Sequence, residues 1–152
     1  GDVENLDLSQ LGKYDAIILG DIIEHLRNPR EFLQKIVKLL NKGGKILISL
    51  PNVANIWVRL NLLFGRFNYS RVGILDESHM RFFTLETSKK IAHDSGLEVL
   101  STNVTPIPLP LILPATSEGR PLSFLHALNW GITRLRKTLF GYQFILVCQP
   151  KP

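Results

Sequence analysis

Apolar and polar positions fall into blocks along the chain that predict an alternation of strands and helices. Residues 14–19 form a continuous apolar run that ends at Gly20, which is typical of a strand buried on both faces of a parallel sheet. Asn28-Pro29 is a typical helix start, and apolar residues then recur at helical spacing until Gly43-Gly44, where a left-handed turn is expected to end the helix. Residues 45–50 read as a second buried strand, so the segment predicts a strand-helix-strand crossover.

The rest of the chain continues the same alternation. Residues 53–64 predict a helix that is apolar on nearly all sides, so we expect other elements to cover most of it. The further elements predicted along the chain are a loop over 65–83, a helix from Thr84 to about Ser95, a strand over 97–104, a proline-rich loop over 105–121, a helix over 122–138 and a strand over 142–148. This order predicts an α/β layered domain.

Composition narrows the class of protein. With 45% hydrophobic and 20% charged residues in 152, the chain has a globular balance that excludes disorder as its main state. A single cysteine, Cys148, excludes a disulfide framework and a Cys-based zinc site, as in proteins of the reducing cytosol. No apolar run is long enough to span a bilayer and the chain starts with acidic residues, so we expect a cytoplasmic protein without membrane insertion.

The net charge of +5 is unevenly distributed. Residues 1–100 carry 13 basic and 12 acidic side chains, whereas residues 101–152 carry 5 and 1. The excess is spread out, without the dense basic stripe and interleaved aromatic residues of a nucleic-acid groove. We therefore expect no nucleic-acid partner.

Several motifs together resemble the second half of a class I S-adenosylmethionine-dependent methyltransferase. They are YDAIILGDIIEHL at 14–26, NP at 28–29, LLNKGGKILISLPN at 39–52 and DESHMRFFT at 76–84. The resemblance implies a partial Rossmann-like fold, with a mostly parallel sheet and a final antiparallel strand. It also implies S-adenosylmethionine as cofactor and methyl transfer to oxygen or nitrogen of a small or carrier-linked acceptor.

Two features of that family have no counterpart in this chain. They are the Gly-rich loop after the family's first strand and the acidic residue that holds the ribose hydroxyls. Residues 1–152 are therefore predicted to be the C-terminal portion of a methyltransferase domain with an incomplete cofactor site, inactive alone. The alternative is a non-catalytic α/β assembly or regulatory module. The apolar strand at 14–19 would then be an open edge, which predicts self-association through that strand.

The resemblance also assigns cofactor-binding residues. Asp2 and Val3 match the place where the family presents an acid and a backbone amide to adenine, although a solvated terminal Asp2 fits equally. Gly20 and Asp21 follow a parallel strand at its carboxyl end, where open α/β sheets bind ligands. Asp21 has the alternative role of capping the turn that follows.

Candidate catalytic residues are His25 and His79. Asp21, Glu24 and His25 are spaced so that they can converge on a metal or a proton, and they resemble an acidic-acidic-His cluster that the ubiquinone-type O-methyltransferase branch associates with a divalent ion. The alternative is that Glu24 and His25 only exchange hydrogen bonds at a helix start. A neutral His79 could accept the proton of a hydroxyl nucleophile, or it could pin its loop to the backbone.

Overall fold

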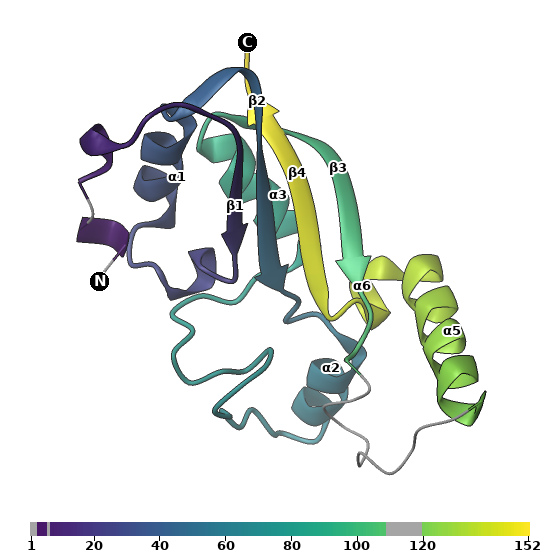
Figure 1. The fold of residues 1–152 in the computed structure, drawn as a ribbon. Helices are drawn as coiled ribbons and strands as arrows, with labels where there is room; N and C mark the ends of the chain where they lie inside the picture. The colour runs from purple at the N-terminus through teal and green to yellow at the C-terminus, as the bar shows by residue number, and fades with distance from the viewer. Residues whose placement is uncertain (1–2, 6, 109–119) are drawn as a thin grey trace.

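The computed structural model describes residues 3–5, 7–108 and 120–152, which form an α/β domain around one sheet (Figure 1). The sheet has four strands in the order β1-β2-β4-β3. These strands are β1 (Tyr14–Gly20), β2 (Leu40–Pro51), β3 (Leu97–Thr105) and β4 (Gln143–Pro150). The helices are α1 (Pro29–Val37), α2 (Ile56–Leu63), α3 (Leu85–Asp94), α5 (Arg120–Leu135) and α6 (Lys137–Phe140), with short 3-10 turns η1 (Val3–Asn5), η2 (Leu8–Gln10) and η3 (Ile23–His25).

Three strands run in one direction and β4 runs against them. β1 pairs with β2 in parallel, whereas β4 pairs antiparallel with both β2 and β3. The α/β class and the antiparallel final strand predicted from the sequence are confirmed. Because β1 lies at one end of the strand order, self-association through residues 14–19 stays a prediction, which light scattering of the concentrated chain can test.

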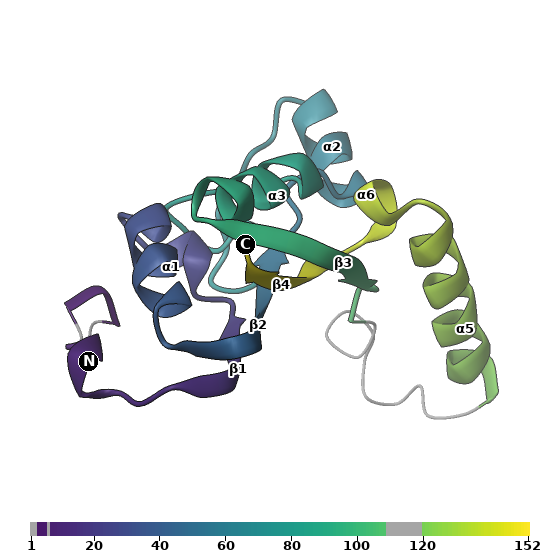
Figure 2. The same cartoon turned by 90° about the horizontal axis from the view of Figure 1, so that it is seen from above.

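The core lies on one face of the sheet, under α1 and α3 (Figure 2). It is built from Phe32, Leu33 and Ile36 of α1, Ala92 of α3 and the inward residues of the strands. The expectation that residues 14–19 are buried on both faces is wrong, because Leu19 is buried while Ile18 is 72% exposed. Strand side chains alternate between faces, and the described helices cover only one face at β1.

The first helix begins where predicted but is stabilised differently. The Asn28 side chain makes no capping hydrogen bond. Instead the Glu4 carboxylate accepts hydrogen bonds from the backbone amides of Arg27 and Asn28. The predicted end at Gly43-Gly44 is wrong, since α1 ends at Val37 and β2 already begins at Leu40. Gly43 does have the expected positive φ of 82°, but it lies within a strand that Leu40 opens by pairing with Tyr14.

The second predicted helix forms, but its burial differs from the prediction. α2 begins after Asn55, whose side chain accepts a hydrogen bond from the Trp57 amide. Only Val58 of this helix is buried, whereas Trp57 is 67% and Leu63 76% exposed. The expectation that other elements cover most of the segment is therefore wrong for the described residues.

The remaining elements agree closely with the sequence. Thr84 begins α3 through a capping box with Thr87, and Gly96 follows the helix with a φ of 86°. The predicted helix over 122–138 corresponds to α5 and α6, and the predicted loop over 105–121 lies mostly outside the described residues. Cys148 is buried, and burial raises the pKa of its thiol to about 11, so it stays protonated near neutral pH. Within the described part of the chain, none of the helices has the length and apolarity to cross a bilayer.

Candidate functional site

A hollow of about 280 Å³ opens at the carboxyl end of β1 and β2, where parallel sheets commonly bind ligands. Its polar lining comes from three places in the sequence: the segment after β1, the loop before α3 and the start of β4. The lining residues are Asp21, Glu24, His25, Pro51, Val72, Gly73, Asp76, His79, Tyr142 and Gln143.

Asp21 connects the ends of three strands at the edge of this hollow. Its carboxylate accepts a hydrogen bond from the Ser49 hydroxyl at 2.7 Å and from the Gln143 side-chain amide at 2.9 Å. Its own backbone amide donates to Ser49 Oγ at 3.1 Å. Asp21 is also the non-glycine residue with positive φ, 51°, in the described chain, a conformation that Asp tolerates better than most residues. Asp21 thus fixes the sharp turn after β1.

Both histidines of the hollow have a defined tautomer. His25 Nδ1 lies 3.1 Å from the Ser78 carbonyl oxygen, and His79 Nδ1 lies 3.1 Å from the Ile74 carbonyl oxygen. Because a carbonyl oxygen only accepts hydrogen bonds, each Nδ1 must carry a proton. In the neutral ring, Nε2 is then an unprotonated nitrogen with a free lone pair. The rings contact each other edge to face, with centroids 4.8 Å apart.

Glu24 is the buried member of the cluster. Its side chain is 1% exposed, and neither carboxylate oxygen has a hydrogen-bond partner in the described structure. Oε1 lies 3.9 Å from His79 Nε2, which is too long for a direct hydrogen bond. The Glu24 backbone carbonyl accepts hydrogen bonds from the amides of Met80 and Arg81, so the loop that carries His79 is fastened to the residue it faces.

Burial shifts the protonation of this pair toward neutral forms. Desolvation raises the pKa of Glu24 from 4.5 to about 7, and the nearby charge of Asp21 adds to the increase. Desolvation also lowers the pKa of His79, so its imidazole is neutral at neutral pH. By contrast, hydrogen bonds from Ser78 lower the pKa of Asp76, which stays ionised.

This arrangement can perform two kinds of chemistry. A neutral imidazole whose Nε2 carries no proton can accept one from a bound hydroxyl that reaches it. One ligand atom each from Glu24, His25 and His79 also lie within 4.8 Å of one another, as needed to hold a divalent cation. Histidines that bind a metal through one ring nitrogen usually donate a hydrogen bond from the other, often to a carbonyl oxygen, as both Nδ1 atoms do here.

The structure brings together only part of the set predicted from the sequence. His25 and His79 meet across the hollow, and Asp21 lines it. The cluster in the structure consists of Glu24, His25 and His79. Asp21 is not a member, because its carboxylate accepts hydrogen bonds from Ser49 and Gln143.

Of the other predicted cofactor residues, the structure describes Val3 and Gly20, and neither belongs to that cluster. Gly20 ends β1 with open space where a side chain would be, and Val3 packs against the core. Asp2 lies outside the described residues. Neither Val3 nor Gly20 lines the hollow among the described residues, and the cofactor roles of all four remain predictions.

Two lining residues at the start of β4 were missed from the sequence. Gln143 donates to Asp21, and the Tyr142 hydroxyl lies 2.9 Å from the place where a Gly73 side chain would begin. Only their position in the folded sheet identifies them as site residues. β4 runs antiparallel to β2, so its first residues lie at the carboxyl ends of β1 and β2. Local sequence does not reveal that return.

Tyr142 also lines a second, apolar space of about 340 Å³, called the apolar chamber below. The chamber is lined by Asn55, Trp57, Ile74, Ile107 and Tyr142. Ile74 directly follows Gly73 of the hollow and supplies the carbonyl that holds His79. A polar hollow and an apolar chamber therefore share one wall.

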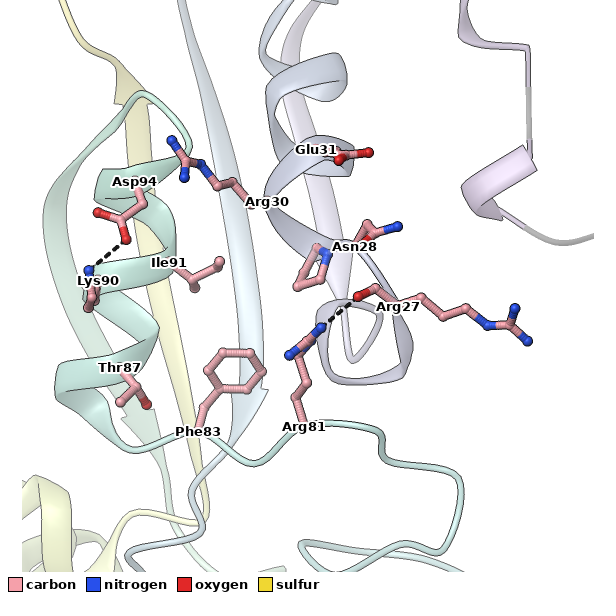
Figure 3. A pocket seen from close by; sticks show the side chains of 11 residues that line it. Arg27, Asn28, Arg30, Glu31, Arg81, Phe83, Thr87, Lys90, Ile91 and Asp94 are labelled. Atoms are coloured by element: carbon pink, nitrogen blue, oxygen red, sulfur yellow. Dashed lines mark hydrogen bonds and ion pairs between the residues drawn. The ribbon is translucent and has the colours of Figure 1, made fainter.

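A second hollow, about 460 Å³, lies between α1 and α3 (Figure 3). Four cationic residues line it, and two of their side chains have hydrogen-bond or ion-pair partners. Lys90 pairs with Asp94 at 2.7 Å, and Arg81 donates a hydrogen bond to the Arg27 carbonyl oxygen at 2.6 Å. The Arg27 side chain points away from the hollow (Figure 3). Arg81 thus anchors the loop before α3 to the start of α1.

Comparison with known proteins relates the chain to one family. A family model described as "Methyltransferase domain" matches residues 2–102. The mitochondrial ubiquinone biosynthesis O-methyltransferase of Homo sapiens is 27% identical over 86 residues, which cover 57% of this chain and 23% of that protein. The ubiquinone biosynthesis O-methyltransferase of Xanthomonas oryzae pv. oryzae is 34% identical over 50 residues, which cover 33% of this chain and 21% of the relative. The chain thus spans less than a quarter of these curated relatives.

Solved structures show the same fold at low sequence identity. A SAM-dependent methyltransferase from Archaeoglobus fulgidus superposes with a TM-score of 0.58 at 19% identity, over 97% of this chain and 65% of that one. The magnesium protoporphyrin IX methyltransferase of Synechocystis with bound SAH gives a TM-score of 0.51 at 17% identity, over 100% of this chain and 49% of that one. The Rossmann-like fold expected from the sequence is therefore confirmed, and these two proteins, one SAM-dependent and one with bound SAH, agree with the expected cofactor.

Proposed function

Because the chain belongs to the methyltransferase domain family, we propose that it takes part in methyl transfer from S-adenosylmethionine to a hydroxyl oxygen of a small or carrier-linked acceptor. The observation that carries this proposal is the pair of histidines whose Nδ1 atoms donate to carbonyl oxygens. This leaves Nε2 of each ring able to accept a proton. An acceptor nitrogen is the alternative, and a neutral amine would have less need of that base.

When bound, S-adenosylmethionine supplies an electrophilic methyl group on a sulfonium sulfur. His79 Nε2 would accept the proton that the acceptor hydroxyl loses when it is methylated. Glu24, whose Oε1 lies 3.9 Å from that nitrogen, would stabilise the imidazolium when its carboxyl group, with a pKa of about 7, is ionised. His25 Nε2 offers a second hydrogen-bond acceptor that orients the acceptor molecule. The residues of the chain thus position the nucleophile and hold one proton.

The apolar chamber gives the proposed acceptor a second feature. Since Tyr142 lines both spaces, a molecule whose hydroxyl lies beside His79 can place an apolar group against Trp57 and Ile107. We infer an acceptor in which a hydroxyl adjoins an apolar ring or chain. Each further methylene buried there should strengthen binding about threefold to fourfold.

Transfer of tritium from methyl-labelled S-adenosylmethionine tests the proposal with a panel of alkylphenols, alkylcatechols and alkylamines. It should be run on this chain and on the longest polypeptide that its gene encodes, because the chain spans a limited share of its relatives. We expect labelled phenols or catechols and a loss of at least a hundredfold in His79→Ala. The matched control is His93→Ala, on the exposed surface of α3. Labelled amines alone would exclude the hydroxyl acceptor.

A second mode of action for the same cluster is favoured by the unpartnered, buried oxygens of Glu24. Glu24, His25 and His79 would hold a divalent cation, which would lower the pKa of an acceptor hydroxyl when bound. Calorimetric titration of Zn²⁺, Mn²⁺ and Mg²⁺ separates the modes. A stoichiometric site that Glu24→Gln and His79→Ala both abolish supports the cation, whereas activity unchanged by a chelator assigns the proton to His79 alone.

The alternative is a non-catalytic assembly or regulatory module on the same scaffold. Equilibrium binding of S-adenosylmethionine separates it from an enzyme. Binding by the longest polypeptide that the gene encodes supports catalysis. No binding by that polypeptide and no binding by this chain would leave the module as the better interpretation.

A further inference from the structure

The exposed apolar residues of the described chain are concentrated on two segments. On α2 and the loop after it, the large exposed side chains include Trp57, Leu60, Leu63, Phe64, Tyr69 and Val72. On α5 they include Phe124, Leu128, Trp130 and Leu135. Scattered apolar residues are ordinary on a protein surface, but contiguous groups of this size mark a surface that meets a partner. We call these two segments together the apolar face.

Contacts through the chamber relate the two segments. The Asn129 side chain of α5 donates to the Ile107 carbonyl oxygen at 2.8 Å, and Ile107 lines the chamber together with Trp57 of α2. The Asn55 amide at the start of α2 donates to the Gly141 carbonyl oxygen just after α6. Both helices lie near the end of the sheet where β2 and β3 terminate (Figure 1).

From Trp57 to Val72, and along α5, the charged residues are all arginines. Residues 53–75 contain Arg59, Arg66 and Arg71 and no acidic residue. α5 contains Arg120 and Arg134 and no acidic residue, and the Arg134 guanidinium lies 5.4 Å from the Trp130 ring centroid. A second copy of the same face would bring arginines against arginines, and Asp76 and Glu77, beyond Val72, are the nearest carboxylates in that loop. The partner that this face fits is therefore apolar in its interior and negatively charged at its surface.

We propose that the apolar face docks on the surface of a bilayer that contains anionic lipids. Leu60, Leu63 and Phe64 would enter the region between headgroups and acyl chains, where Trp57 and Trp130 would lie at the interface. The arginines would contact the lipid phosphates. This is peripheral binding without a spanning segment, and it does not depend on the proposed methyl transfer.

The two tryptophans make the proposal directly testable, because they are the only two in the chain and each helix carries one. Large vesicles of phosphatidylcholine alone and of phosphatidylcholine with phosphatidylglycerol should be titrated into the chain of residues 1–152. We expect a blue shift of tryptophan emission and co-sedimentation with the anionic vesicles, at least tenfold stronger than with phosphatidylcholine and weakened by salt. Trp57→Phe and Trp130→Phe then report each helix separately, and an unshifted Trp130 would remove α5 from the face.

Matched variants distinguish binding through the apolar face from nonspecific adsorption to vesicles. Leu63→Ser should weaken vesicle binding about tenfold, and Arg66→Gln should weaken it about fivefold. Ile18→Ser is the control, because Ile18 is 72% exposed on β1, away from the apolar face. Circular dichroism verifies that each variant folds. The proposal fails if neither vesicle binds, if both bind equally, or if Ile18→Ser weakens binding as much as Leu63→Ser.

Discussion

Helices α2 and α3 lie on either side of the loop that carries His79, yet they relate to the rest of the molecule in opposite ways. α3 is the more polar helix, and it buries Ser88 and Ala92 against the sheet. α2 is apolar at most positions but buries only Val58. The more hydrophobic helix is thus the more exposed one. A helix is buried only where the fold packs another element against it. An apolar composition alone does not make a helix buried.

The N-terminal caps of the two helices also differ: the cap of α3 is local, whereas the cap residue of α2 also bonds to a distant segment. Thr84 and Thr87 form a reciprocal capping box that is complete within four residues of sequence. Asn55 caps α2 through Trp57 but also donates its amide to Gly141, 86 residues away. Asn52 makes a similar bond to Gly141 at 2.8 Å. The N-cap residue of α2 is therefore bonded to a distant segment, whereas the cap of α3 is formed within its own first turn.

The largest difference between the helices should appear when a charge is placed on each. Ala92→Asp puts a carboxylate at a site that is fully buried in the core, which should destabilise the protein by about 3–5 kcal/mol. Leu63→Asp on α2 should change stability by no more than about 0.5 kcal/mol, because Leu63 is 76% exposed. Urea unfolding measures both, and equal losses would mean that α2 is covered in solution.

A smaller effect is expected at Glu24, which fastens the loop between the two helices. Its pKa rises from 4.5 to about 7, so the folded state binds more protons than the unfolded state between these values. Stability from this group is therefore lost as pH rises from 4.5 to 7, by about 3 kcal/mol. Glu24→Gln should stabilise the protein by up to that amount at pH 8 and have little effect at pH 4. Denaturant titrations at both pH values test the sign, and destabilisation at pH 8 would contradict the burial of an ionised Glu24.

The smallest effects concern the two caps. Asn55→Ala removes a cap and leaves the Gly141 carbonyl with one donor fewer, which should destabilise the protein by about 2 kcal/mol. Thr84→Ala removes only a local cap and should lower stability by about 1 kcal/mol. Thermal unfolding compares them under one condition. A larger loss for Thr84→Ala would show that α2 does not depend on its bond to Gly141.

Agreement between sequence and structure follows the range of the interactions. The capping box of α3, the glycine after it and the apolar strands are local patterns, and each formed where it was predicted. The end of α1 was misplaced because Leu40 pairs with Tyr14, a contact that local periodicity does not encode. At the site, His25 and His79 were identified, whereas Gln143 and Tyr142 depended on how β4 returns along the sheet.

The sequence alone determined the α/β alternation, the family and the two histidines, because these depend on short motifs and on the period of apolar residues. Only the tertiary structure decided that Glu24 is buried beside His79 and that Asp21 bonds to Ser49 and Gln143 instead of joining them. It also decided that the most apolar helix remains largely exposed. These outcomes depend on contacts between distant segments, and burial, which shifts pKa values and exposes surfaces, is a property of the packed chain.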